Sequence, residues 1–272
     1  QILEDLRDLT VHTPVGGASV YGGVGMGPQE HAFRSGVDVI VGTQANQQLP
    51  ALVARAREGS RQPLIDLNPY EDVSFPFGLT RRDDPVRAYV TIIEGCNEFC
   101  AFCVVPYTRG HERMRPAAEI IAEVRHAAAT GRREVQLLGQ IVNHYQAPDR
   151  ADVDFARLLE LVSEVDGIER IRFASPHPRH VTPRVIAAIR DLPKVCRHLH
   201  MPVQSGSNRI LKAMRRRYTR ESYLDTVAQV RDAIPGISIS PDMIVGFPDE
   251  RPADFDDTLS LTEAVRFQSM FS

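Results

Sequence analysis

The sequence has no tryptophan, only four cysteines, and no apolar run long enough to cross a membrane. Four cysteines are too few for the disulfide framework of a small secreted domain, so we expect a soluble protein of the reducing cytoplasm that makes no membrane contact. An excess of one charge is also lacking, because 32 Lys and Arg residues are balanced by 35 Asp and Glu residues. A nucleic-acid partner would therefore bind a local basic patch and not the whole surface.

The first 85 residues are interrupted often by glycine and proline. Short strands are predicted at 18–23 and 37–43, and a helix is predicted at 46–59. The stretch 61–85 contains four prolines and little periodicity, so it is interpreted as a connection without regular structure.

Strand-like and helix-like segments alternate regularly after residue 85. The strands are predicted at 86–93, 134–139, 170–174, 198–203, 237–245 and 267–271. The helices are predicted at 117–130, 154–166, from the Thr182-Pro183 cap onward, 207–214, 219–234 and 252–265. This alternation indicates parallel strands joined by helical crossovers, in either a barrel or an open doubly wound sheet.

The domain boundaries follow from this change of pattern. Residues 1–70 are interpreted as part of a small α/β domain, 71–85 as a linker, and 86–272 as a second α/β domain. Because Gln1 is not a start methionine, we expect the chain to be part of a longer protein.

Three of the four cysteines fall within eight residues, in EGCNEFCAFCVVPYTRGHERMRP (94–116). Cys96, Cys100 and Cys103 have the spacing C-x3-C-x2-C. Three thiols cannot all pair with one another, so the spacing indicates a metal or cluster site. An iron–sulfur cluster held by three thiolates leaves one iron open, and a small molecule can bind there.

The position of the cysteine motif agrees with a catalytic role. It follows the first strand of the alternating series, and parallel α/β folds place their sites at the carboxyl ends of strands. Phe102, between the last two cysteines, can shield a cluster from water. A structural zinc site stays open as the alternative, although zinc ligands usually come as two separate pairs. Its fourth ligand would be His111, His198 or His200.

Several separate motifs resemble the radical S-adenosylmethionine (radical SAM) superfamily and, within it, the MiaB-type tRNA methylthiotransferases. They are GCNEFCAFCVVPYTRGHERMRP (95–116), LLGQIVNHY (137–145), HLHMPVQSGSNRILKAMRRRYTRESY (198–223) and PDMIVGFPDE (241–250). The resemblance extends from about Arg87 to the end of the chain. It implies an α/β fold: a partial (βα)6 TIM-like barrel, preceded by part of a small α/β N-terminal domain.

The resemblance also implies a set of cofactors. A 4Fe-4S cluster would be held by Cys96, Cys100 and Cys103, and its open iron would bind S-adenosylmethionine (SAM). One electron would then cleave SAM to a 5′-deoxyadenosyl radical, so the family uses an electron donor such as flavodoxin or ferredoxin. The chain is expected to act as a monomer.

Residues near the predicted strand ends are candidates for SAM binding. They are Phe102, Gly139, Gln140, Gln204, Asp242 and Gly246. Gly246 would let SAM approach the backbone, and Gln204 would point into the mouth of the barrel. Simpler interpretations stay open, since Gln140 could be solvated in a turn and Asp242 at a strand end. His177 is either a site residue or a structural histidine, and Cys196 is interpreted as a small packed residue.

The substrate implied by the resemblance is N6-isopentenyladenosine in the tRNA anticodon loop, which receives a methylthio group at C2. Proteins read RNA mainly at such single-stranded loops. The candidate tRNA contacts are Arg109, Arg115, Arg215, Arg216 and Arg217, with Arg209, Lys212 and Arg220 in the same basic stretch. A solvated helix face is the simpler interpretation of that stretch. Other open functions are methylthiolation of threonylcarbamoyl-adenosine or of a ribosomal-protein aspartate, and a non-catalytic, metal-stapled RNA-binding domain.

The first part of the sequence departs from the family pattern. Methylthiotransferases deliver sulfur from a second, auxiliary 4Fe-4S cluster held by three N-terminal cysteines, but residues 1–95 contain no cysteine. The loop at Val24–Met26 lacks the expected one, which leaves the auxiliary cluster in doubt; His12 and His31 are the nearby imidazoles. We also expect the family's C-terminal RNA-binding domain to lie outside this sequence. Smaller departures are Met114, Ile141 and Asp249, where the family favours Ser, Asn and Gly.

Overall fold

The computed structural model describes residues 38–41, 48–58, 64–66 and 82–272. These residues fall into two compact units. Tyr107–Gly110 group with the short elements before residue 67, and the remaining residues from 82 onward form the second unit. The strand predicted at 18–23, the loop at Val24–Met26, and both His12 and His31 lie outside the described residues. The domain boundaries given above stay a prediction.

The first unit contains a parallel strand pair and a helix. β1 (Val39–Val41) pairs with β2 (Leu64–Asp66), and α3 (Leu49–Arg57) lies between them in sequence. The apolar face of α3 buries Leu52 and Val53. The strand predicted at 37–43 and the helix predicted at 46–59 are therefore confirmed.

β2 corrects the interpretation of 61–85 as a connection without regular structure. The strand is only three residues long and lies among prolines, so it leaves no periodic signal. Its pairing partner, β1, is what makes it a strand.

The second unit is built on parallel strands. They are β3 (Arg87–Thr91), β6 (Glu134–Leu138), β7 (Arg170–Phe173), β8 (His198–His200) and β9 (Ser238–Ser240). β3, β6 and β7 form one sheet in that order, and β8 pairs with β9. Single parallel bridges link Ile171 with Val195 and Asp242 with Phe271. Neighbouring strands thus follow one another in sequence, as in a barrel and unlike a doubly wound sheet, so the predicted partial barrel is confirmed.

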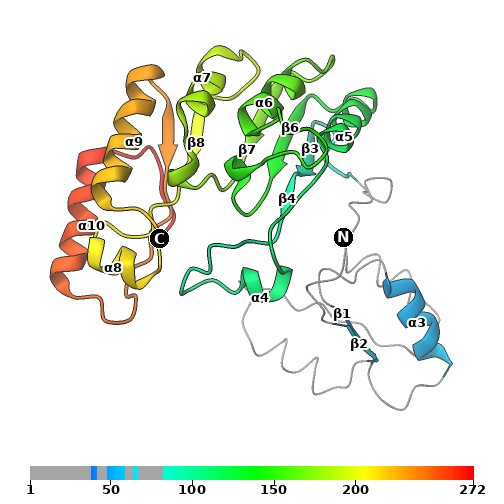
Figure 1. The fold of residues 1–272 in the computed structure, drawn as a ribbon, viewed down its shortest axis with the longest axis horizontal. Coiled ribbons are helices and arrows are strands. Elements are labelled where there is room, and N and C mark those ends of the chain that lie inside the picture. Colours follow the sequence, from blue (N-terminus) through cyan, green and yellow to red (C-terminus); the bar gives the residue numbers. More distant parts are fainter. Residues whose placement is uncertain (1–37, 42–47, 59–63, 67–81) are drawn as a thin grey trace. The chain divides into compact units, whose positions relative to one another are not determined.

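Helices cover the outer side of the curved row of strands (Figure 1). They are α5 (Ala117–Ala129), α6 (Phe155–Ser163), α7 (Pro183–Asp191), α8 (Asn208–Ala213), α9 (Arg220–Ala233) and α10 (Pro252–Val265). Side chains of Asp154, Thr182, Ser207 and Thr219 accept hydrogen bonds from backbone N–H groups of the first helical turn. No described helix combines the length and apolar character needed to cross a bilayer.

The core lies between the strands and these helices. Val90, Leu137, Ile171, Leu199 and Ile239, one from each strand, are completely buried. Each such side chain contributes roughly 1.5–3 kcal/mol relative to an exposed position. The core therefore fixes the strands, and the strands fix where their carboxyl ends meet.

The strands at the end of the unit are shorter than predicted. The predicted strands 198–203 and 237–245 each form only three ladder residues, β8 and β9, and 267–271 contributes one bridge. Pro202 and Pro241 explain the first two cases, because proline has no N–H to donate to a ladder.

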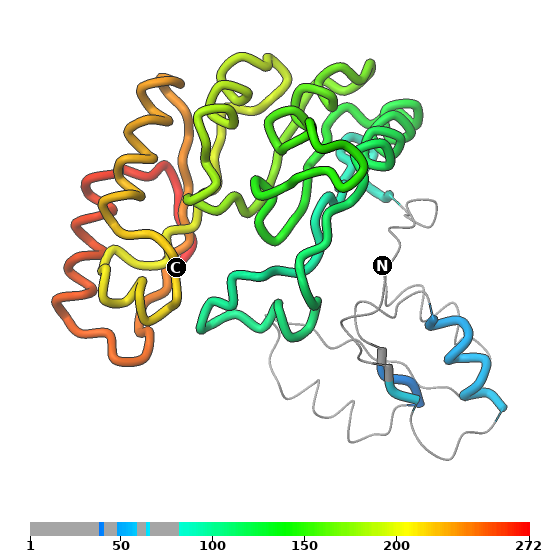
Figure 2. The backbone as a smooth tube through the Cα atoms, viewed as in Figure 1, coloured from blue at the N-terminus to red at the C-terminus, as the bar shows by residue number. Residues whose placement is uncertain are grey.

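Short elements that were not predicted follow β3. β4 (Ile93–Glu94) pairs antiparallel with β5 (Arg113–Met114), and α4 (Val105–Arg109) lies between them in sequence. The Glu94 carboxylate forms a 3.7 Å ion pair with Arg113 across the ladder. Figure 2 shows the chain leaving the sheet after β3 and returning before α5. This two-residue ladder closes the base of the segment that carries the three cysteines.

Candidate metal centre

The three cysteines lie on residues 95–103, called here the cysteine loop. Gly95 and Phe99 adopt left-handed φ angles of 71° and 48°, which turn the chain sharply. The backbone N–H of Cys103 donates to the carbonyl of Cys100 at 3.0 Å, so the C-x2-C part is a tight turn. All three thiols are free, and Cys96 is the buried one, with 9% of the residue exposed.

The thiol chemistry fits a metal ligand. Burial raises the pKa of the Cys96 thiol to about 11, so without a cation this group stays protonated at neutral pH. A bound metal removes that proton and turns the thiol into a ligand. Phe102, which lies in sequence between Cys100 and Cys103, is 40% exposed.

The histidines proposed as the fourth ligand of a structural zinc site have other partners. No three His, Cys, Asp or Glu side chains of the described residues come close enough together to hold one metal ion. The proposed fourth ligands are engaged elsewhere: His111 contacts Asn97, His198 contacts Ser240, and His200 contacts Asp242. A four-iron cluster binds each thiolate through a different iron, so its ligands need not converge on one point. The donor set therefore fits the cluster.

Two neighbouring loops anchor the cysteine loop. The buried carboxylate of Glu98 accepts from Arg179 at 2.6 Å, and Arg217 lies 3.7 Å from its other oxygen. The backbone N–H of Ala101 donates to the carbonyl of Met214 at 3.0 Å. Arg179 follows β7 and Met214 is the C-cap of α8. The loop is therefore held by residues that lie much later in the sequence.

Arg216 makes a direct contact with a candidate ligand. Its Nη1 lies 3.4 Å from the Cys100 Sγ, and its Nε donates to the Tyr218 hydroxyl at 3.0 Å. The guanidinium also stacks over the Tyr218 ring, with Cζ 5.0 Å from the ring centroid. Sequence reasoning singled out Arg216 as a phosphate contact, but in the structure its guanidinium faces the thiol.

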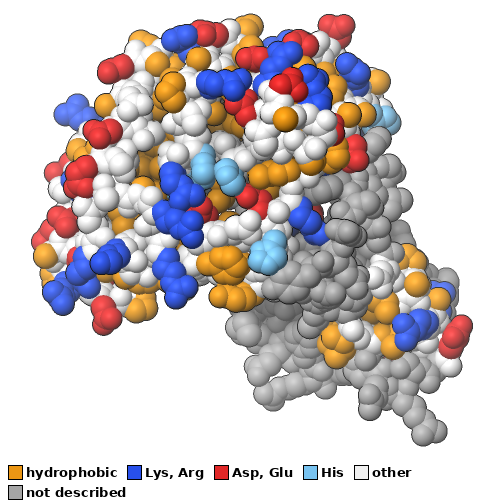
Figure 3. Space-filling model, in the orientation of Figure 1, with side chains coloured by type: hydrophobic (Ala, Val, Ile, Leu, Met, Phe, Trp, Pro, Cys, Tyr) orange, Lys and Arg blue, Asp and Glu red, His pale blue; other side chains and the backbone are white. Residues whose placement is uncertain are grey.

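Three histidine rings lie close together beside the residues that hold the cysteine loop. The rings of His144 and His180 lie 4.3 Å apart between centroids, and His177 lies 5.7 Å from His180. His144 Nδ1 is 2.9 Å from the Glu112 carboxylate, a hydrogen bond that raises the pKa of His144. Figure 3 shows histidine side chains together near the middle of the face drawn, with charged side chains beside them. Neither His144 nor His180 was predicted as a site residue. His144 follows β6 and His180 follows β7, and a contact between segments this far apart in sequence leaves no local pattern.

His177 is held rigidly and is buried, with 4% exposed. The Asn143 side chain bonds both the N–H and the carbonyl of His177, at 2.8 and 3.0 Å. Burial, with Arg216 and His180 nearby, lowers the pKa of His177 far below its usual value, so the ring is neutral. Nδ1 accepts from the Arg179 backbone at 3.3 Å, so Nε2 carries the proton, and it has no hydrogen-bond partner among the described residues.

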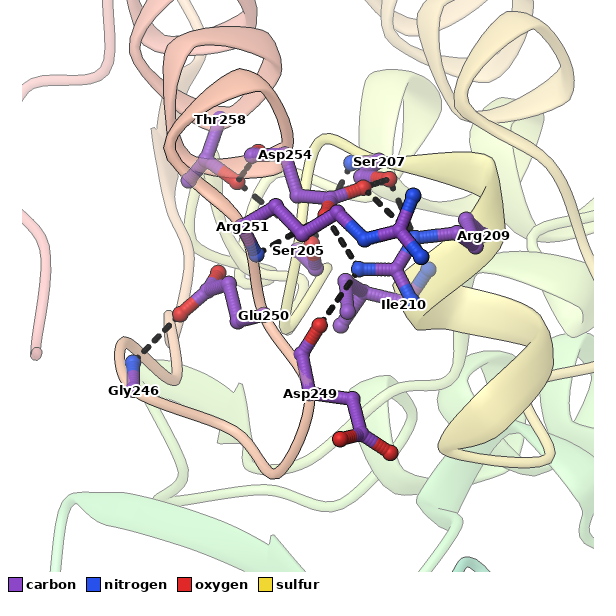
Figure 4. Close-up of polar contacts among 10 residues, drawn as sticks. All are labelled: Ser205, Ser207, Arg209, Ile210, Gly246, Asp249, Glu250, Arg251, Asp254 and Thr258. Carbon is purple, nitrogen blue, oxygen red and sulfur yellow. Dashed lines mark hydrogen bonds and ion pairs between the residues drawn. The ribbon is translucent and has the colours of Figure 1, made fainter.

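The loop after β8 is packed tightly against α10. Gly206 leaves no space for a side chain, because a Cβ there would lie 2.4 Å from the Asp257 carbonyl oxygen. Ser207 Oγ donates to the Asp254 carboxylate at 2.6 Å, and Arg209 also binds this carboxylate (Figure 4). Arg209 and Ser207 hold the pKa of Asp254 well below its usual range. Gln204 just precedes this anchor and has a left-handed φ of 73°, which is costly for a non-glycine residue.

Gly246 and Asp249 shape the loop after β9. Both have left-handed φ angles, 75° and 66°. The N–H of Gly246 donates to the Glu250 carboxylate, and the carbonyl of Asp249 accepts from Arg209 at 2.6 Å (Figure 4). A Cβ on Gly246 would meet nothing within 4 Å, so this backbone is open on one side.

Two other SAM candidates have structural partners. Gly139 packs against β4, since a Cβ there would lie 3.1 Å from the Cβ of Ile93. Asp242 Oδ1 lies 2.8 Å from His200 Nε2. Gln140 is half-buried in the turn directly after β6. Gln140, Gln204 and Gly246 all follow strands at the carboxyl end of the sheet, as predicted for a site of this fold.

The prediction that Arg115 contacts tRNA is wrong. Arg115 is 2% exposed and binds Glu123 and, at 3.3 Å, Glu119, because its backbone enters the core beside β3. Arg215 and Arg217 are exposed, which a phosphate contact requires. Arg109 ends α4 and belongs to the other unit. Cys196 is half-buried, and its N–H bonds the carbonyl of Ile171.

Comparison with protein families matches most of the second unit. The family model described as the radical SAM superfamily matches residues 90–262, which include the cysteine loop and every strand from β4 to β9.

Curated relatives are similar over most of this chain. A tRNA-2-methylthio-N(6)-dimethylallyladenosine synthase of Thermoanaerobacter pseudethanolicus is 46% identical over 241 residues, covering 87% of this chain and 50% of the relative. The proteins of that name from Moorella thermoacetica and Alkalilimnicola ehrlichii are each 48% identical, covering 87% of this chain and 53% of the relative. The chain thus spans about half the length of the curated relatives it matches.

Solved structures share the fold. The radical S-adenosylmethionine methyltransferase TsrM of Kitasatospora setae, bound to tryptophan and a SAM analogue, matches with a TM-score of 0.63 and 16% identity over 85% of this chain and 50% of TsrM. The cobalamin-dependent radical enzyme OxsB, bound to aqua-cobalamin and SAM, matches with a TM-score of 0.64 and 12% identity over 100% of this chain and 47% of OxsB.

Proposed function

Because this chain belongs to the radical SAM superfamily, we propose that it carries the radical-generating site for adding a methylthio group to C2 of N6-isopentenyladenosine in the tRNA anticodon loop. The observation that carries the proposal is the cysteine loop, with three free thiols at the carboxyl end of the first barrel strand. The shared name of the curated relatives supports the substrate, since dimethylallyl and isopentenyl denote the same group.

Cys96, Cys100 and Cys103 would hold a 4Fe-4S cluster. When bound, this cluster supplies the electron that cleaves SAM to a 5′-deoxyadenosyl radical. Glu98, through Arg179 and Arg217, holds the loop in place for it. The burial of Cys96 limits the access of water to this part of the loop.

SAM would lie against the turns that follow the strands. Gly139, Gln140, Gln204 and Gly246 are the proposed contacts. The anchor between the Gln204 turn and α10 keeps this turn from moving when SAM binds, because Gly206 is pressed against the helix backbone. A rigid turn loses little entropy on binding.

The tRNA would lie on the exposed side of the same mouth. Arg215 and Arg217 remain the proposed phosphate contacts, since both are exposed next to the cysteine loop's anchor. A flavodoxin or ferredoxin would supply the electron. The chain's fourth cysteine, Cys196, lies apart from the loop in sequence, so the chain itself lacks three thiolates for an auxiliary cluster.

Anaerobic reconstitution tests the cluster. We expect about four iron and four sulfide per chain, iron-based charge-transfer bands, and release of 5′-deoxyadenosine from SAM after reduction. Cys100→Ala is expected to lose all three, because it removes a ligand. Stoichiometric zinc without these bands would contradict the proposal.

Hydrogen transfer tests the substrate without requiring sulfur insertion. An anticodon stem-loop deuterated at C2 of isopentenyladenosine is incubated with reduced protein and SAM. The deuterium content of the 5′-deoxyadenosine is then measured by mass spectrometry. We expect one deuterium in the product. Deuterium arriving instead from labelled threonylcarbamoyl-adenosine or from a labelled ribosomal-protein aspartate would refute the substrate assignment.

A further inference from the structure

Arg216 owes its position to the end of α8. Arg215 adopts a left-handed φ of 59°, its N–H bonds the carbonyl of Lys212, and the N–H of Arg216 bonds the carbonyl of Leu211. This pair of bonds is the Schellman ending of a helix, here without the usual glycine. It turns the chain at a fixed angle, and the next side chain is Arg216.

The guanidinium is then fixed by its surroundings. Burial raises the pKa of Tyr218 to about 12, so the phenol stays protonated; it donates to the carbonyl of Val203 at 2.8 Å and accepts from Arg216 Nε. Nη2 of Arg216 lies 3.5 Å from the carbonyl of Pro202. These contacts leave Nη1 directed at the sulfur of Cys100.

Among the described residues, no carboxylate neutralises the charge of Arg216. Its neighbour Arg217 pairs with Glu98, but no acidic side chain in the described part of the chain forms an ion pair with Arg216. A half-buried cation without a carboxylate partner is stabilised by negative charge on a contacting acceptor that can become a thiolate ligand. That acceptor is Cys100, whereas the Cys96 sulfur interacts with the backbone N–H of Glu98.

We propose that Arg216 is a positioning residue that donates a hydrogen bond to the Cys100 ligand and raises the reduction potential of the cluster. The inference rests on the proposed function, because it requires that the cysteine loop hold a cluster. One-electron reduction adds negative charge to the cluster and its thiolates, and a cationic donor at one sulfur stabilises the reduced form more than the oxidised form. Arg216 therefore makes the cluster easier to reduce by a weak cellular donor.

The test is a redox titration of the reconstituted full chain, followed by electron paramagnetic resonance. Arg216→Gln removes the charge and, because the side chain is shorter, the Nη1 donor that faces Cys100. At the wild-type midpoint, we expect the ratio of reduced to oxidised cluster to fall by about tenfold, which is a shift of about 59 mV to more negative potential for one electron. Iron and sulfide content should match wild type.

Two further variants make the result specific. Arg217→Gln removes a neighbouring charge that faces Glu98 and not a thiol, so it should shift the potential much less than Arg216→Gln does. Tyr218→Phe keeps the ring but removes the hydroxyl that orients Arg216, so it should shift the potential in the same direction by a smaller amount.

The outcomes are distinguishable. Equal potentials for wild type and Arg216→Gln at equal iron content would overturn this inference and leave the proposed function intact. An equal shift in Arg217→Gln would also overturn it. The potential would then depend on the positive charge near the cluster and not on the hydrogen bond from Arg216 to Cys100. Failure of wild type to bind iron would instead overturn the proposed function.

Discussion

Gly206 in the candidate site leaves no room for a side chain. A Cβ would lie 2.4 Å from the carbonyl oxygen of Asp257 and 2.6 Å from the Cα of Thr258, and these backbone atoms cannot rotate away. We expect Gly206→Ala to lower the free energy of unfolding by about 3 kcal/mol, the upper end for overpacking. Urea denaturation of the cluster-free protein measures this loss.

Gly236 provides the matched control. Its φ of 80° strains any other residue, but a Cβ would meet nothing within 4 Å. Gly236→Ala should therefore cost only the conformational term, about 1–2 kcal/mol. If both substitutions cost the same, close packing of Gly206 against α10 is not what requires the glycine.

Arg115 is a core residue whose charge is paired with buried Glu123. It binds Glu123, which also binds Arg82, and donates to the carbonyl of Thr91 in β3 at 3.3 Å. We expect Arg115→Leu to lower the free energy of unfolding by about 3 kcal/mol, because removing one partner leaves a buried charge behind. The loss stays at the low end of the range because Arg82 still contacts Glu123.

The exposed Arg125 on α5 is the comparison for this variant. Arg125→Leu should change stability by less than about 0.5 kcal/mol, as surface substitutions usually do. Both values come from chemical denaturation followed by circular dichroism. A loss for Arg115→Leu as small as that for Arg125→Leu would mean that the Glu123 pair contributes little.

At the scale of elements, the short 3-10 helix η4 (Pro178–His180) makes the second unit sensitive to acid. Burial and the neighbouring charges of His144 and Arg179 lower the pKa of His180 to about 4, and that of His177 lies lower still, while Glu112 acts in the opposite direction on His180. As the pH falls, the unfolded chain binds protons at these histidines near pH 6.5, whereas the folded chain binds them only at lower pH. Their contribution to stability is therefore present above about pH 6.5 and is lost as the pH falls toward 4.

His144 has the opposite linkage, because Glu112 raises its pKa and its contribution is lost as the pH rises. We expect the melting temperature of the cluster-free chain to fall by several degrees between pH 7 and pH 4.5. His180→Asn should flatten this dependence, because it removes one group that must be protonated on unfolding. An unchanged slope in that variant would show that other groups control the acid sensitivity.

The elements also show what the sequence could and could not predict. The long helices α5, α6, α9 and α10 were predicted nearly to the residue, because an amphipathic period repeated over several turns is a local signal. The three-residue strands β2, β8 and β9 were missed or drawn too long, since pairing with a distant strand and proline interruptions decide their extent.

The residues of the candidate site also differ in whether the sequence could identify them. Cys96, Cys100 and Cys103 could be identified because their spacing is local. The role of Arg216 could not, because its contact with Cys100 joins residues 116 positions apart. A run of arginines predicts a basic surface, whereas the turn at Arg215 sends only Arg216 toward the sulfur.

At the scale of the whole molecule, the chain contains the three cysteines proposed to hold one cluster and a single further cysteine. We expect reduced, reconstituted protein to cleave SAM but to form no methylthio product in isopentenylated tRNA, because activated sulfur is not supplied. Mass spectrometry of tRNA nucleosides after incubation with SAM and sulfide measures this. Methylthio-adenosine made by this chain alone would show that a second cluster is dispensable for sulfur insertion.

The link between Cys100 and Arg216 also has a consequence during synthesis of the protein. The ribosome makes these residues 116 positions apart, which at common elongation rates takes on the order of ten seconds. During that interval the three thiols have left the ribosome or are leaving it, while the guanidinium, the Arg217 anchor and the Met214 carbonyl do not yet exist. Iron delivered in that period meets a loop without Arg216 beside Cys100, and iron delivered later meets the fully anchored loop.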